Sequence, residues 1–180
     1  MDILKTNEAN CKDCYKCIRY CPVNAIRVSE GHAQVDPDRC ILDGRCYKVC
    51  PQHAKTLRND IEKVKDIIKF NDYTIASIAP SFFAYYPKPV RGKILTAMHY
   101  LGFDKLEQTS RAAYTVSMAH LEYFKKDALV ITSSCPSAVF LMEKYYPDLL
   151  PHLAPVISPM AAHYKILEKE HHKPFKMVFI

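Results

Sequence analysis

The sequence lacks any apolar stretch near the roughly 20 residues that a helix needs to cross a bilayer. Residues 1–20 also lack an apolar run flanked by charge, the mark of an exported chain. The formal net charge is +6, but lysine and arginine are scattered, so no nucleic-acid surface is expected. Ser81 and Ser133 have no recognisable His–Asp partner, which disfavours serine hydrolase chemistry. The sequence predicts no membrane or nucleic-acid partner.

Cysteine almost disappears after residue 50. Seven of the eight cysteines precede that point, and the eighth is Cys135. The seven form two runs, Cys11-x2-Cys14-x2-Cys17-x3-Cys21-Pro22 and Cys40-x5-Cys46-x3-Cys50-Pro51. The first run has the spacing of bacterial ferredoxins, whose thiolates hold iron–sulfur clusters. Structural zinc uses ligands in pairs and disulfide frameworks belong to secreted proteins, so both explain the pattern less well. Thiolate clusters without an export signal predict a cytoplasmic protein.

The two runs predict ligands for two clusters. In two-cluster ferredoxins the cysteine before proline ligates the cluster of the other run. The first cluster is therefore predicted to use Cys11, Cys14, Cys17 and Cys50. The second is left with Cys21, Cys40 and Cys46, one ligand short of four.

Asp43 stands where the second run would need its missing cysteine to restore the two-residue spacing. A carboxylate can ligate iron, but it is a harder donor than a thiolate at this soft site. The second cluster is then either a four-iron cube with an Asp43 corner or a three-iron cluster. Alternatively, Asp43 only shapes the turn with Gly44 and ligates nothing.

The organisation of the chain changes near residue 60. Residues 1–59 contain two similar cysteine blocks, each followed by a β-like segment, at 25–28 and 54–57. This part is too small to bury much apolar area, so the clusters are expected to supply folding free energy. Beyond residue 60, we expect strands at 74–79, 128–132 and 175–180, and helices at 60–68, 91–101, 111–125, 136–146 and from 159. The fold class is thus an α+β two-cluster ferredoxin-like domain, residues 1–59, followed by an α/β domain with a parallel sheet, residues 60–180.

The loop from Thr132 to Pro136 lies between a predicted strand and a predicted helix, where α/β folds place ligand sites. It carries Cys135, which is either a ligand or reactive thiol, or a small buried hydrophobe. His163, on the last predicted helix, is expected to have a structural role.

Several segments resemble the [FeFe] hydrogenases in order and spacing. They are Ile78-Ala-Pro-Ser81, Leu101-Gly-Phe103, Thr132-Ser-Ser-Cys-Pro136, Glu143-Lys-Tyr-Tyr-Pro-Asp-Leu-Leu150 and Ser158-Pro-Met160. The ferredoxin runs in front of them fit the same family. The resemblance covers essentially the whole chain and implies a hydrogenase-type α/β domain after the ferredoxin part.

The resemblance implies roles for two residues. Cys135 matches a cysteine that ligates the four-iron part of the H-cluster, and Ser134 stands at the family's proton-relay cysteine. A hydroxyl is a much weaker acid than a thiol, so proton relay is expected to be impaired. In this respect the chain resembles sensory members of the family.

The family needs three further cysteines, and none follows Cys135 in this sequence. We therefore expect this chain to be the N-terminal portion of a hydrogenase-like protein. Its clusters would relay electrons between a redox partner protein or ferredoxin and an H-cluster. Missing C-terminal segments would complete that H-cluster. Such a protein would interconvert protons and hydrogen at full length and be inactive as this chain. The alternatives are a redox or hydrogen sensory module, or a ferredoxin fused to an inert α/β scaffold.

Overall fold

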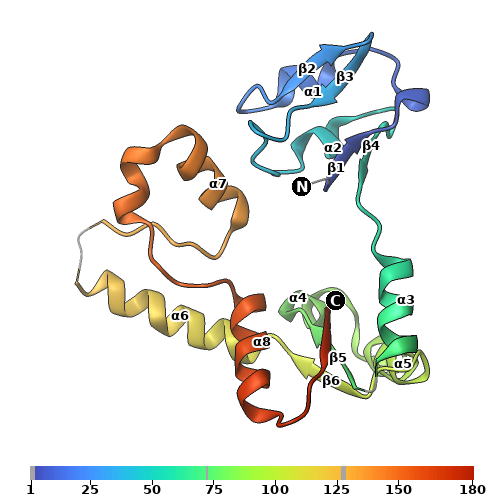
Figure 1. Cartoon of the computed structure of the whole chain (residues 1–180), viewed down its shortest axis with the longest axis vertical. Helices are drawn as coiled ribbons and strands as arrows, with labels where there is room; N and C mark the ends of the chain where they lie inside the picture. Colours follow the sequence, from blue (N-terminus) through green and yellow to red (C-terminus); the bar gives the residue numbers. More distant parts are fainter. Residues whose placement is uncertain (1–2, 72, 127–128) are drawn as a thin grey trace. The chain divides into compact units, whose positions relative to one another are not determined.

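The computed structural model describes residues 3–71, 73–126 and 129–180 (Figure 1). It divides into two compact units, and each is described by itself. The first contains Met1–Asn59 with Cys135–Leu153, and the second contains Asp60–Ser134 with Ala154–Ile180. In the described part of the chain, no helix is long and apolar enough to cross a membrane.

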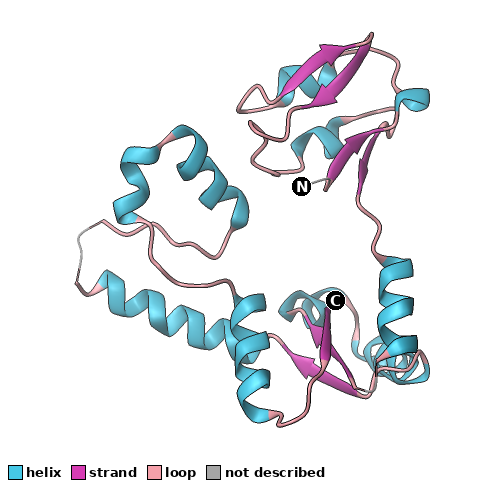
Figure 2. Ribbon diagram, viewed as in Figure 1, coloured by secondary structure: helices cyan, strands magenta, loops and turns pink. Residues whose placement is uncertain are grey.

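Short elements make up the ferredoxin-like part of the first unit (Figure 2). In chain order they are β1 (Leu4–Thr6), η1 (Glu8–Asn10), α1 (Lys16–Tyr20), β2 (Ile26–Ser29), β3 (His32–Val35), α2 (Arg45–Val49) and β4 (Lys55–Leu57). Strand β1 pairs antiparallel with β4, and β2 pairs antiparallel with β3. The β2–β3 turn is formed by Glu30 and Gly31, both with positive φ, as a tight two-residue hairpin turn requires.

The two cysteine loops repeat each other in backbone conformation with a constant offset of 29 residues. Helices α1 and α2 keep this offset at both ends. Three positions in each loop have positive φ, and they form the pairs Asp13 with Leu42, Tyr15 with Gly44, and Asn24 with His53. Such left-handed residues are uncommon outside glycine, so the shared pattern marks a shared loop geometry. With this offset, Asp43 is the repeat equivalent of Cys14, and Lys55 is the repeat equivalent of Ile26.

The second unit is built on a parallel sheet in the order β6-β5-β7. Its strands are β5 (Thr74–Ile78), β6 (Lys105–Gln108) and β7 (Lys176–Phe179). Every residue of β5 is buried, as expected for a central strand covered on both faces. The predicted fold class, a ferredoxin-like part followed by a parallel α/β part, is confirmed.

Helices cover the two faces of β5. Ala76 and Ile78 pack with Val64 and Ile68 of α3 (Ile61–Phe70), Phe82 of α4 (Pro80–Tyr85) and Met98 of α5 (Lys88–Tyr100). Because side chains alternate along a strand, Ser77 faces the other side, where it meets His163 of α8 (Pro159–Glu170). Helix α8 packs against α6 (Ser110–Phe124) through Ala112, Val116 and Ala162.

One predicted strand is wrong and one observed strand was missed. Residue 128 lies outside the described residues, but 129–132 form no strand of the sheet, and Leu129 is 54% exposed. The position beside β5 belongs instead to β6, whose sequence Lys-Leu-Glu-Gln carries little apolar signal. An apolar run predicts that a segment is buried. A strand also needs a neighbouring strand to form hydrogen bonds with its backbone N–H and C=O groups, and an apolar run does not indicate such a neighbour.

Helix α5 ends just before Gly102, close to the end predicted at residue 101, and the cause is local. Gly102 has φ +108°, a conformation that side chains disfavour, and an added Cβ would lie 2.6 Å from Cγ2 of Ile68. The other predicted helices are observed as α3, α5, α6, α8 and α7 (Pro136–Tyr145), with ends within a few residues of expectation.

Candidate metal centres

The four cysteines predicted for the first cluster line one cavity. Cys11, Cys14 and Cys17 come from the first loop, and Cys50 comes from the end of α2 in the second. The crossover predicted from sequence therefore brings the remote cysteine to the other three. Four thiols around one cavity fit the donor set of an iron–sulfur cube.

Backbone amides donate to cysteine sulfurs at equivalent places in the two loops. The N–H groups of Ala25 and Ala54 donate to Sγ of Cys21 and Cys50, each at 3.3 Å. Amide donors stabilise thiolates and tune the clusters that they bind. This second observation therefore also fits iron–sulfur ligation.

The second predicted set, Cys21, Cys40, Cys46 and Asp43, surrounds the second loop. Cys21 and Cys40 pack in one apolar cluster, and the N–H of Leu42 donates to Sγ of Cys40 at 3.3 Å. Cys46 is buried, and the charges of Cys40 and Asp43 both act on its thiol. The four side chains predicted as ligands thus belong to one neighbourhood.

The Asp43 side chain is engaged within its own turn. Its Oδ1 accepts a hydrogen bond from the Arg45 N–H at 3.2 Å, and its Oδ2 lies 3.9 Å from Nε of Arg45. This supports a turn-shaping role. The repeat equally supports a ligand role, because Asp43 occupies the place of Cys14 in a loop of the same backbone conformation. Both interpretations stay open.

The thiols differ in their electrostatic surroundings. Burial raises the pKa of Cys17 above its ordinary value and that of Cys46 to about 11, and the charge of Lys55 is the largest effect opposing it. At Cys50 burial acts in the same direction, but backbone N–H groups, that of Ala54 first, outweigh it and lower the pKa. The buried thiols must lose protons on binding metal, so metal loading competes with protons.

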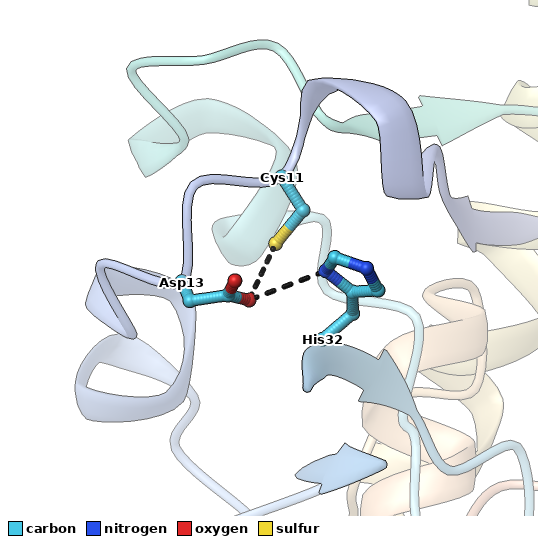
Figure 3. A group of neighbouring side chains, drawn as sticks. All are labelled: Cys11, Asp13 and His32. Atoms are coloured by element: carbon cyan, nitrogen blue, oxygen red, sulfur yellow. Dashed lines mark hydrogen bonds and ion pairs between the residues drawn. The ribbon is translucent and has the colours of Figure 1, made fainter. Parts of the chain in front are cut away.

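A small polar group lies at the margin of the first loop (Figure 3). Asp13 Oδ1 accepts a hydrogen bond from the Cys11 thiol at 3.4 Å and faces Nδ1 of His32 at 3.3 Å. The three ligand atoms lie within 4.8 Å of one another, close enough for a metal ion. Since Cys11 is shared with the first cysteine set, this group borders that site and does not form a separate one.

Sequence reasoning missed Lys55. Its side chain is 2% exposed, and it lines the cavity formed by the first cysteine set. Aligning the two repeats would have revealed it, because it replaces the buried Ile26.

Helix α7, which begins just after Cys135, packs on the second cysteine loop. Ser137 Oγ donates to the carbonyl of Leu42 at 3.1 Å, and Lys144 Nζ donates to that of Cys40 at 2.8 Å. The Tyr145 hydroxyl reaches two more carbonyls of the ferredoxin-like part, those of Val23 and Arg39. Phe140, Leu141 and Tyr145 add apolar contacts. These polar and apolar contacts together attach the helix firmly to this loop.

The two residues placed by resemblance lie at the start of this helix. Cys135 is exposed at the N-cap position of α7, where its carbonyl accepts from the N–H groups of Ala138 and Val139. Ser134 is exposed and belongs to the second unit.

His163 is fully buried in the second unit. Its Nδ1 lies 2.7 Å from Ser77 Oγ, which lies 2.7 Å from Thr109 Oγ1, and Thr109 donates to the carbonyl of Ile78. Because that donation uses the Thr109 proton, Ser77 must donate to Thr109 and accept from Nδ1–H of His163. Burial lowers the pKa of His163, and its buried hydrogen bond with Ser77 agrees with the expected structural role.

Two family models match the chain. The model of the iron-only hydrogenase large subunit, C-terminal domain, matches residues 72–180, and the model of a 4Fe-4S dicluster domain matches residues 10–54.

Curated relatives match over different parts of the chain. Iron hydrogenase 1 of Clostridium pasteurianum is 28% identical over 185 residues, covering 87% of this chain and 32% of that protein. A component of the ion-translocating oxidoreductase complex of Methanosarcina acetivorans is 42% identical over 57 residues, covering 32% of this chain and 22% of that protein. Ferredoxin 7Fe of Hydrogenibacillus schlegelii is 45% identical over 38 residues, covering 21% of this chain and 49% of that protein. The chain thus spans a third or less of the length of the first two of these relatives.

Proposed function

Since the chain belongs to the iron-only hydrogenase large-subunit family and carries a dicluster ferredoxin domain, we propose that it transfers electrons through two iron–sulfur clusters to a hydrogenase-type site that begins at Cys135. One observation carries the proposal: helix α7, which starts at Cys135, packs on the loop of the second cysteine set. Electron transfer between centres requires that they be held close together. The attachment of α7 to the second loop within one compact unit supports such an arrangement.

Each part of the chain has a defined task in this proposal. Cys11, Cys14, Cys17 and Cys50 hold the first cluster, and Cys21, Cys40 and Cys46 hold the second, with Asp43 at its fourth corner. Bound clusters supply one-electron carriers. Amide donors stabilise the thiolates, helix α7 packs on the second loop, and a redox partner protein or ferredoxin exchanges electrons with the clusters.

The nuclearity of the second cluster is part of the proposal. A carboxylate at the Asp43 position holds the fourth iron less firmly than a thiolate would. The similarity to a protein named ferredoxin 7Fe supports a three-iron form, because seven irons correspond to one four-iron and one three-iron cluster.

A sensory function is the second candidate, and Ser134 favours it. The family's proton relay uses a thiol at this position, and a hydroxyl there would slow proton delivery. A slow site can report redox state or hydrogen without high turnover. Restoring the thiol tests this interpretation: in a protein with a complete hydrogenase-type site, Ser134→Cys should raise hydrogen turnover at least tenfold if proton relay limits it.

Anaerobic reconstitution tests the leading proposal directly. The protein should bind roughly seven to eight irons per chain and show two reducible centres by electron paramagnetic resonance after dithionite addition. A value near four irons, or zinc in place of iron, would refute the two-cluster assignment.

The same chain should neither evolve nor oxidise hydrogen. Outside the two cluster sets it offers Cys135 as its single thiolate, and one thiolate does not retain a cube against water. After treatment with a synthetic diiron cofactor, infrared spectra should show no bound carbonyl or cyanide bands. Their appearance would reveal ligands other than those assigned here.

A further inference from the structure

Lys55 is a buried cation in the middle of the ferredoxin-like part. Its side chain is 2% exposed, and it lies in β4 opposite Thr6 of β1. Nζ donates to Thr6 Oγ1 at 2.6 Å and to the carbonyl of Ala33. Both acceptors are neutral oxygens, and in the described part of the chain no carboxylate pairs with the ammonium. Lysine is seldom fully buried without a partner of opposite charge.

The repeat shows that the fold itself does not need a lysine here. Ile26, which is 29 residues earlier, occupies the equivalent place and is 6% exposed. An apolar side chain therefore fills this position in one half of the repeat, whereas an ammonium fills it in the other. Burying an ammonium carries a large desolvation penalty, which a nearby negative charge must offset. The two sets of thiolates supply negative charge nearby, because the charge of Lys55 acts on both Cys17 and Cys46.

Lys55 is close to both sets. It lines the cavity formed by Cys11, Cys14, Cys17 and Cys50, the predicted ligands of the first cluster. Its charge also acts on Cys46, a predicted ligand of the second, and lowers the pKa of that thiol against the effect of burial. One side chain thus acts electrostatically on both loops.

We propose that Lys55 is a counter-charge shared by both clusters, and that it raises the reduction potential of each. The reason is Coulombic: a reduced cluster carries one more negative charge than an oxidised one, so a buried cation stabilises the reduced state. Each cluster takes one electron from an external low-potential reductant. The proposal rests on the proposed electron-transfer function, because it concerns clusters that accept electrons.

Redox titration of the reconstituted protein, followed by electron paramagnetic resonance, tests this. The key variant is Lys55→Met, which keeps an unbranched side chain one atom shorter and removes its charge. At a fixed potential, we expect the ratio of reduced to oxidised centres to fall about three- to tenfold for both clusters, and tenfold corresponds to ~59 mV for a one-electron couple. Lys55→Arg, which keeps the charge, should leave both potentials close to those of the wild type.

Lys48→Met is the matched control. It removes the same charge from the exposed face of α2, two residues from Cys46 and from Cys50 in the sequence. Solvent screens an exposed charge, so its effect should be less than a third of that of Lys55→Met. Equal shifts in the two variants, or a shift of only one cluster in Lys55→Met, would overturn the shared counter-charge.

Loss of clusters is also informative. If Lys55→Met and Lys55→Ile bind no clusters while Lys55→Arg binds both, the charge is needed to hold the anionic centres, which supports the proposal. If the arginine variant fails as well, the position requires a particular shape and the proposal is wrong. A wild-type protein with fewer than two reducible centres refutes the proposed function itself, whereas two centres unchanged by Lys55→Met refute only the role of Lys55.

Discussion

The two cysteine loops have the same backbone and different surroundings. Three pairs of left-handed residues and two short helices repeat at an offset of 29 residues. At that offset, Cys14 corresponds to Asp43 and Ile26 to Lys55. Helix α7 covers the second loop through Ser137 and Lys144. The comparison indicates that cysteine spacing and left-handed positions determine the loop, whereas a few substitutions give each centre its own chemistry.

The largest effect should come from cutting the crossover that links the two halves. Cys50→Ser is expected to remove the first cluster, although Cys50 follows the second loop, and Cys21→Ser is expected to remove the second. A serine hydroxyl is a poor replacement for a thiolate on iron. Cys14→Ser, the control within one half, should damage only the first cluster. Iron content and electron paramagnetic resonance of each variant would show which cluster remains.

If Cys50→Ser and Cys21→Ser each damaged the cluster of their own loop, the crossover would be wrong. The cavity lined jointly by Cys11, Cys14, Cys17 and Cys50 argues against that outcome.

Asp43 and Cys14 occupy equivalent positions in the two loops, and exchanging them should change which cluster loses an iron on oxidation. In the wild type, mild oxidation should produce a three-iron signal from the second cluster. Asp43→Cys should abolish it, because a thiolate retains the fourth iron more firmly. Cys14→Asp should create a similar signal from the first cluster. If Asp43→Cys left the spectrum unchanged, Asp43 would be a turn residue, as its bond with the Arg45 N–H also permits.

How far the sequence predicts this site depends on the range of the interaction. Cysteine spacing is local, and it grouped Cys50 with the first loop, whose cavity Cys50 also lines, because the crossover rule accompanies the motif. Strand pairing is not local: residues 129–132 looked like a strand, yet Lys105–Gln108 takes the place beside β5. The burial of Lys55 was not predicted, because a lysine in a β-like segment normally faces solvent; the sequence signal for it was its alignment with Ile26 in the repeat.

The contact with α7 was beyond sequence reasoning for the same reason. Nothing in the segment from Pro136 to Tyr145 indicates that its Lys144 and Tyr145 side chains reach carbonyls about a hundred residues earlier in the chain. The resemblance to a known family marked Cys135 and the segment from Glu143 to Leu150, but it did not indicate which part of the chain the helix contacts.

A third, smaller effect should come from weakening the contact of α7 with the second loop, because this contact stabilises only the second cluster. Lys144→Met removes the hydrogen bonds from Nζ to the carbonyls of Pro37 and Cys40. Losing them should cost about 1–2 kcal/mol and speed chelator-induced loss of the second cluster roughly fivefold or more. The first cluster should be lost at the wild-type rate. Lys16→Met, which removes a lysine beside the first loop, is the control and should leave the second cluster unaffected.

If Lys144→Met left the loss of the second cluster unchanged, the hydrogen bonds of α7 would not stabilise that loop. Tyr145→Phe provides an independent check, because it removes the hydroxyl that reaches Val23 and Arg39 while keeping the ring.

The smallest effects should appear at the left-handed position that precedes each short helix. This position is Tyr15 in the first loop, with φ 55°, and Gly44 in the second, with φ 71°. No atom lies within 4 Å of a Cβ added at Gly44, so Gly44→Ala introduces backbone strain without a clash. That strain is about 1 kcal/mol, which should speed loss of the second cluster about fivefold.

Tyr15→Gly is the reciprocal change, and its two consequences oppose each other. Glycine relieves the strain of a left-handed tyrosine, but it also gives the unfolded chain more conformational freedom. The net change in the rate of first-cluster loss should therefore be less than about threefold. If the left-handed backbone causes both effects, Gly44→Ala must change the loss rate of the second cluster alone. This change must be larger than the change that Tyr15→Gly causes at the first cluster. If Gly44→Ala speeds the loss of both clusters equally, the two loops unfold together. In that case strain in one loop destabilises the whole cysteine-rich part.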